Sequence, residues 1–266
     1  MAVAAALAVG GLVGVISGLT GIGGGVLMVP FLYALYARLE VPRDTATVLA
    51  HATSLAVIVP AAVRGLLGYR GTRLIEWRSA IPIGVTGALA ALATARLVPG
   101  IPAGPLRVGF GVFLLVISLA LLLRRGPLAP HARTGRHHVL LAALAGIPVG
   151  VLSAALGVGG GVPATMVMLY ILRTPFPQLA PTSLAFIIFT AFAGALGYLL
   201  TPAPPLPFGW VAGHVDFGHG LPLAIGAVAL APVGVRLNRR LPVMTLRRVF
   251  GALLLLLGLS LIWRNA

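Results

Sequence analysis

Two glycine-rich stretches are the most distinctive chemical feature of this strongly apolar chain. The first is "GVISGLTGIGGGVLMVP" at residues 14–30, and the second, "GVLSAALGVGGGVPATM", begins at Gly150. Four glycines within five residues weaken a helix, and glycine permits positive φ and close backbone approach. A helix that resumes after such a break presents free N–H groups and the positive end of its dipole, which attract anions. The stretches therefore predict an oxyanion site, with candidate residues Thr20, Gly21, Gly23, Gly24, Gly25, Gly157, Gly159, Gly160 and Gly161.

Close helix packing accounts for some of these glycines but not for the two dense runs. Gly10, Gly14 and Gly18 are spaced four apart, as are Gly146 and Gly150, which is typical of helices that pack closely in membranes. A nucleotide-binding loop would need a preceding strand, a lysine or a suitably placed acidic residue, and none is indicated. We therefore assign the earlier glycines to packing and the later ones to the anion site.

Two Thr-Ser pairs recur at corresponding places after the glycine stretches. They are Thr53-Ser54 in "ATSL" and Thr182-Ser183 in "PTSL". Their hydroxyl groups can donate hydrogen bonds to an oxyanion. The alternative is that they bond to carbonyl groups of their own helices, as serine and threonine in membrane helices commonly do.

Ionisable side chains inside the apolar segments are few, and each is a functional candidate. His51 precedes the first Thr-Ser pair and could donate to an anion, or could be a neutral histidine bonded to a carbonyl. Arg64 lies near the end of its segment and could attract substrate or extend to the membrane interface. The acidic residues all fall in links or near segment ends: Glu40, Asp44, Glu76 and Asp216. A cation site or a proton relay would need a carboxylate inside the membrane, so the composition favours an anion.

No set of residues indicates catalysis or a cofactor. The chain has no cysteine, no pair of carboxylates and neither an HExxH nor a GxSxG motif. We expect no catalytic residue, no metal ligand and no cofactor, and the protein is predicted not to be an enzyme.

The elements that must position these residues are transmembrane helices. Of the 266 residues 59% are hydrophobic and 9% are charged, and the mean hydropathy is +1.06. The net charge of +15 comes from arginines in the links, which set membrane orientation, and no basic stripe with aromatics suggests nucleic acid.

The apolar segments span about residues 2–37, 45–67, 79–98, 105–123, 138–172, 179–201, 219–237 and 244–263. The first and fifth are too long for one crossing of about 30 Å, so each is expected to break at its glycines. The prediction is an all-α polytopic membrane protein with eight apolar segments and up to ten helical pieces.

The chain also contains an internal repeat. Residues 14–25 match residues 150–161 at an offset of 136, "ATSL" matches "PTSL" at 129, and Ile81-Pro82-Ile83 matches Leu221-Pro222-Leu223 at 140. We expect an N-terminal membrane repeat at 1–126, a cytoplasmic linker at 127–137 and a C-terminal membrane repeat at 138–266. If the two long segments each turn back, 14 of the 19 arginines fall on one side of the membrane. That topology predicts inverted repeats with both termini outside, an architecture common among secondary transporters.

These motifs together resemble the TauE/SafE family of sulfite-exporter-like anion transporters. The resemblance rests on "GLTGIGGGVLMVP", "ALGVGGGVPATM", the Thr-Ser-Leu repeats and the duplicated halves. It implies an inner-membrane permease for sulfur-containing anions such as sulfite, sulfoacetate or other organosulfonates. The alternatives are an anion channel using the same site, and a membrane scaffold or sensor without transport. The expected partners are the anion and the lipid bilayer, and a homo-oligomer is compatible with the sequence.

Overall fold

The computed structural model describes residues 2–123, 136–206, 210–240 and 243–265. Ten α-helices lie in these ranges: α1 (Ala2–Thr20), α2 (Gly25–Arg38), α3 (Arg43–Leu67), α4 (Trp77–Leu97), α5 (Ala103–Leu123), α6 (Arg136–Leu156), α7 (Gly161–Tyr170), α8 (Phe176–Leu199), α9 (Phe217–Asn238) and α10 (Val243–Asn265). A 3-10 turn, η1 (Val98–Gly100), follows α4, and a two-stranded hairpin, β1 (Val211–Ala212) with β2 (Val215–Asp216), precedes α9.

The predicted all-α polytopic membrane fold is confirmed. Seven helices in the described ranges, α1, α3, α4, α5, α6, α8 and α9, are long and apolar enough to cross a membrane. Large apolar side chains such as Leu12, Leu89 and Ile225 are exposed on the outer helices. Such a surface is unfavourable in water and favourable against lipid tails.

Both long apolar segments break at their glycines, as predicted. α1 ends at Thr20 and α2 begins at Gly25, while α6 ends at Leu156 and α7 begins at Gly161. The half-helices α2 and α7 have 14 and 10 residues, which is too short to span about 30 Å.

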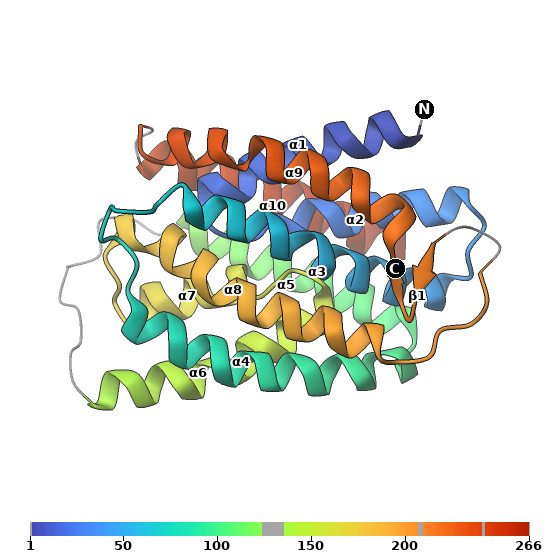
Figure 1. Ribbon diagram of the computed structural model, residues 1–266, viewed down its shortest axis with the longest axis horizontal. Helices are drawn as coiled ribbons and strands as arrows, with labels where there is room; N and C mark the ends of the chain where they lie inside the picture. The colour runs from blue at the N-terminus through green and yellow to red at the C-terminus, as the bar shows by residue number, and fades with distance from the viewer. Residues whose placement is uncertain (1, 124–135, 207–209, 241–242, 266) are drawn as a thin grey trace.

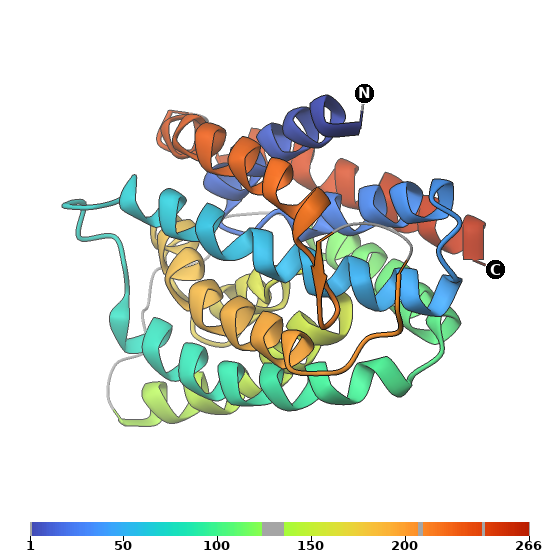
Figure 2. The same ribbon diagram turned by 45° about the vertical axis from the view of Figure 1, so that its right-hand side comes forward.

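α3 and α8 form the centre of the molecule, between two outer pairs of helices. α1 packs on α9 along one side, α6 packs on α4 along the other, and α5 packs on α10 (Figure 1 and Figure 2). Of the residues in the candidate membrane span of α3 78% are buried, and in that of α8 67%, whereas the other five candidate spans are 33–39% buried. The two central helices carry the two Thr-Ser pairs, so these pairs lie in the interior.

The two outer pairs depend on glycine. A Cβ on Gly14 would collide with the backbone of Ala227, and a Cβ on Gly150 would collide with the backbone of Gly87. Gly14 corresponds to Gly150, and Gly87 to Ala227, at the sequence offsets. The packing role predicted for the earlier glycines is confirmed, and the same contact occurs twice, each time between the two halves.

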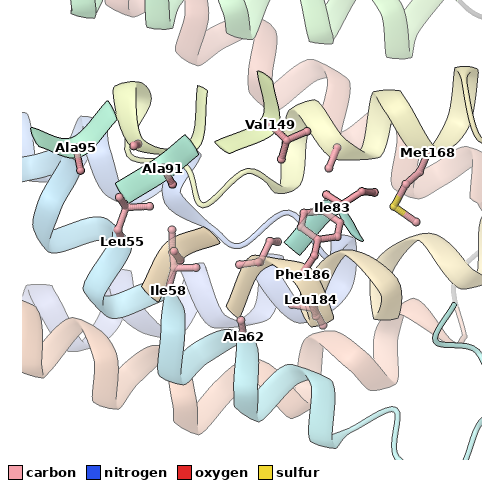
Figure 3. Close-up of a cluster of buried hydrophobic side chains, with 14 of the residues drawn as sticks. Leu55, Ile58, Ala62, Ile83, Ala91, Ala95, Val149, Met168, Leu184 and Phe186 are labelled. Atoms are coloured by element: carbon pink, nitrogen blue, oxygen red, sulfur yellow. The ribbon is translucent and has the colours of Figure 1, made fainter. Parts of the chain in front are cut away.

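An apolar core joins the two halves around the central helices. Leu55 and Ile58 of α3 and Phe186 of α8 pack in one buried cluster with side chains from α4, α6 and α7 (Figure 3). This burial fixes the relative positions of the Thr-Ser pairs and of the two breaks. Most of the predicted linker, within residues 124–135, lies outside the described residues, and α6 begins at Arg136.

Candidate anion site at the crossing of the two breaks

The two breaks share one backbone conformation that glycine alone adopts readily. All six glycines that precede the half-helices have φ between 67° and 90°, in the left-handed region. They are Gly21, Gly23 and Gly24 in the first break and Gly157, Gly159 and Gly160 in the second. This explains why the sequence carries the same glycine pattern twice.

The breaks lie against each other, and we call residues 21–25 and 157–161 together the crossing. A Cβ on Gly25 would lie 2.6 Å from the carbonyl oxygen of Gly157, and a Cβ on Gly161 would lie 2.5 Å from that of Ile22. Ile58 and Ile187 of the central helices lie near both Gly23 and Gly159. The two predicted walls of the site are therefore brought together, in direct backbone contact.

Two helix N-termini meet at the crossing. α2 begins at Gly25 and α7 at Gly161, and their N-cap residues Gly24 and Gly160 provide no side-chain hydrogen bond to the first turn. The first N–H groups of a helix have no partners within it, and the N-terminus carries a partial positive charge. The arrangement therefore concentrates backbone donors and positive potential in the interior, where the first turns of α2 and α7 contribute no cationic side chain.

The predicted hydroxyl groups are placed differently from one another. Ser54 Oγ donates to the carbonyl of Gly157 at 2.8 Å and so contacts the crossing directly. Ser183 Oγ instead lies 3.8 Å from Met168 Sδ, which is a weak interaction. Thr20 Oγ1 donates to the carbonyl of Ile16 at 2.7 Å and accepts from the N–H of Ile22 at 3.3 Å, so it caps the first break.

Thr53 and Thr182 make the same contact in opposite halves. Thr53 Oγ1 accepts from the N–H of Asp216 at 2.9 Å, and Thr182 Oγ1 accepts from the N–H of Glu76 at 3.0 Å. Both threonines are buried, on the central helices that flank the crossing.

The two predicted ionisable residues lie in very different surroundings. His51 is fully buried, its Cα lies 2.6 Å from the Cβ position of Gly157, and its Nε2 is 2.5 Å from the hydroxyl of Tyr33. It therefore lies at the crossing, bonded to a tyrosine rather than to a carbonyl. Arg64 is exposed in the last turn of α3, ten residues beyond Ser54 or about 15 Å along the helix. Its position fits the alternative in which Arg64 extends to the membrane interface, and it does not lie at the crossing.

Several polar residues near the site were not among the sequence-based candidates. Thr190 Oγ1 donates to the carbonyl of Gly159 at 2.9 Å. Ser17 and Ser153 are fully buried, and neither hydroxyl has a hydrogen-bond partner among the described residues. A Cβ on Gly160 would lie 3.4 Å from that of Ser153. The repeat offset of 136 pairs Ser17 with Ser153, which is the signal that could have found them.

Asp216 also differs from expectation. Like the other acidic residues it lies in a link, at the start of α9, but it is only 1% exposed. Its position in a link is as predicted, but the fold buries its carboxylate, which the sequence analysis did not foresee. A buried carboxylate needs partners, and its partners come from α2 and α9.

The cavity of about 390 Å³ that residues 199–206, Val211 and Gly213 line contains no residue of either break, so it is separate from the crossing.

Comparison with known proteins identifies the chain's relatives. The family model described as "Sulfite exporter TauE/SafE" matches residues 6–261, which is nearly the whole chain. The chain belongs to the TauE/SafE family. Relatives of this TauE/SafE protein include the probable membrane transporter protein YunE of Bacillus subtilis, which is 24% identical over 95% of this chain and 94% of its own length. A probable membrane transporter protein of Methanocaldococcus jannaschii is 25% identical, and one of Xylella fastidiosa 28%, each over 96% of this chain and 93% of the relative. No solved structure matches the chain significantly.

Family membership establishes the general function of this TauE/SafE protein. It is a multi-pass membrane transporter, since the family model is described as a sulfite exporter and the relatives are named probable membrane transporter proteins. The crossing brings together two helix N-termini, beside the Ser54 and Thr190 hydroxyl groups that donate to its carbonyls. Free backbone N–H groups at helix N-termini are chemically suited to an anion rather than to a cation.

Proposed function

We propose that this protein exports small sulfur-containing anions, sulfite or an organosulfonate such as sulfoacetate, across the cell's inner membrane by alternating access. One observation carries the proposal: the N-termini of α2 and α7 meet at the crossing, where α2 begins at Gly25 and α7 at Gly161. Helix N-termini bind oxyanions through backbone donors. The description of the family as sulfite exporters supports sulfur as the element that the anion contains.

The repeated contacts support two halves with opposite orientations in the membrane. The first helix of each half packs on the fourth helix of the other, α1 on α9 and α6 on α4. The arginine distribution favours the same topology. In an inverted arrangement, the halves can rock around a fixed central site and open it to either side in turn.

Export is energetically reasonable for a monoanion. Leaving an inside-negative cell releases about 2.3 kcal/mol per 100 mV. An anion channel is the alternative, because it would exploit the same gradient and the same site. Saturable, slow flux supports the transporter, and unitary currents would support the channel.

A thermal-shift screen of the purified protein tests the proposal. A ligand at 100 times its dissociation constant stabilises the state that binds it by about 2.7 kcal/mol. We expect sulfite or an organosulfonate to raise the melting temperature, and chloride at the same ionic strength to have a smaller effect. Ser54→Ala should weaken the shift, because Ser54 contacts the crossing. The matched control is Ser118→Ala, because Ser118 is a buried serine bonded to the Gly251 carbonyl at 2.7 Å between α5 and α10. Equal shifts in both variants would contradict the assigned site.

A further inference from the structure

A buried polar cluster surrounds Asp216 at the start of α9. Its carboxylate Oδ2 accepts from the hydroxyl of Tyr36 at 3.1 Å and lies 2.7 Å from His219 Nδ1, while Oδ1 accepts from the His219 N–H at 3.1 Å. The Asp216 N–H donates to Thr53 Oγ1. The cluster therefore ties α9, in the second half, to α2 and α3 in the first.

A corresponding cluster surrounds Glu76 at the start of α4. Glu76 Oε1 lies 3.1 Å from His138 Nε2, Oε2 accepts from Ser79 Oγ at 3.0 Å, and the Glu76 N–H donates to Thr182 Oγ1. Thr174 Oγ1 lies 3.5 Å from Oε2. This cluster ties α4, in the first half, to α6 and α8 in the second.

The sequence repeat relates the two clusters. Adding the offset of 140 to Glu76 gives Asp216, and adding 129 to Thr53 gives Thr182. The same backbone-to-threonine hydrogen bond is therefore made twice, each time across the two halves. The clusters lie at opposite ends of the molecule, since the β1–β2 hairpin before α9 is at one end and the link between α3 and α4 at the other (Figure 1).

We propose that these clusters act as two latches. Each latch holds one end of the transporter closed, and the two latches open in alternation. The hairpin latch is Asp216 with Tyr36, Thr53 and His219, and the link latch is Glu76 with Ser79, His138 and Thr182. Separating the halves at one end breaks the hydrogen bonds of that latch and leaves the other latch intact. It also releases the hydroxyl of Thr53 or Thr182 on the helices beside the crossing, where it can donate to an incoming anion. The inference rests on the alternating access of the proposed function.

The chain's lack of cysteine allows a direct test by thiol labelling. One cysteine is introduced, at Ser17 or Ser153, where no hydrogen bond is lost because both hydroxyls are buried without a partner in the described part of the chain. A membrane-impermeant maleimide is then added to right-side-out or to inside-out vesicles. Asp216→Asn should raise labelling from the face that carries the hairpin, and Glu76→Gln from the opposite face.

Each increase should be about tenfold or more, because a hydrogen bond to a charged group shifts an equilibrium by roughly that factor. The control is Asp44→Asn, because Asp44 Oδ1 accepts from the Ala103 N–H at 2.7 Å within one half. It should leave labelling from both faces unchanged. If Asp216→Asn fails to fold, Thr53→Val removes the hydrogen bond from the Asp216 N–H and leaves the Asp216 carboxylate in place. Thr53→Ser keeps the hydroxyl group and should restore the wild-type labelling pattern.

Increases from the same face for both latches, or no increase in any latch variant, would overturn the proposal. The labelling needs no substrate, so this result is independent of the anion screen. Loss of the anion-induced thermal shift with face-specific labelling intact would instead contradict the proposed substrate site.

Discussion

Replacing Gly25 by alanine tests whether the crossing is as tight as the structure shows. Gly25 has helical φ, so alanine there meets no backbone strain, and the effect isolates the contact between the breaks. The new methyl group would lie 2.6 Å from the Gly157 carbonyl oxygen and 2.7 Å from Val158 Cα, neither of which can rotate away. Overpacking of this kind costs about 3 kcal/mol at the upper end of its usual range. The better helix propensity of alanine returns up to about 1 kcal/mol.

The net loss of about 2 kcal/mol corresponds to a fall of roughly 4–8 °C in apparent melting temperature for a chain of this size. The assay is thermal unfolding of the purified protein in detergent. Gly109→Ala is the matched control, because Gly109 is helical in α5 and a Cβ there would meet nothing within 4 Å. It should raise the melting temperature by roughly 1–4 °C. Equal or greater stability of Gly25→Ala would refute the backbone contact at the crossing.

Three further outcomes are expected. Tyr198→Phe removes the 2.8 Å hydrogen bond to the Ala154 carbonyl near the end of α6 and should lower the unfolding free energy by about 1–3 kcal/mol, whereas Tyr170→Phe at an exposed position should change it little in the same melts. Tyr33→Phe deprives buried His51 of its hydroxyl partner and should destabilise the protein by a similar amount, and unchanged stability would show that this bond is dispensable. Burial lowers the pKa of His214 in the β1–β2 hairpin, so its neutral form stabilises the fold above about pH 6.5, and this contribution is lost as the pH falls further. His214→Gln should therefore flatten the acid side of the stability curve measured by thermal melting, and parallel curves for variant and wild type would contradict this assignment.

The elements of the fold were predictable because their signals are local. The length of each apolar segment predicts a helix, and the glycines at 21–25 and 157–161 predict the two breaks, which the structure places at those residues. The packing role of Gly14 and Gly150 follows from their spacing for the same reason.

The polar contacts between the halves were not predictable in this way. Asp216 lies in a polar link, and its partner Tyr36 is 180 residues away, so only the tertiary fold reveals that the carboxylate is buried. Thr53 and Thr182 were recognised as candidates, but their donors are backbone N–H groups of the opposite half, which carry no sequence signal. Extending the offset of 140 back to Glu76 and Asp216 would have related the two acidic residues from the sequence alone.

The central claim is that a sulfur oxyanion binds where α2 and α7 begin. An experimental structure of the protein with selenite, the heavier analogue of sulfite, tests it most directly, since anomalous scattering locates selenium without ambiguity. We predict a selenium peak between the first turns of α2 and α7, within hydrogen-bond reach of the N–H groups beside Gly25 and Gly161. A peak confined to the cavity lined by residues 199–206, with none at the crossing, would contradict the claim.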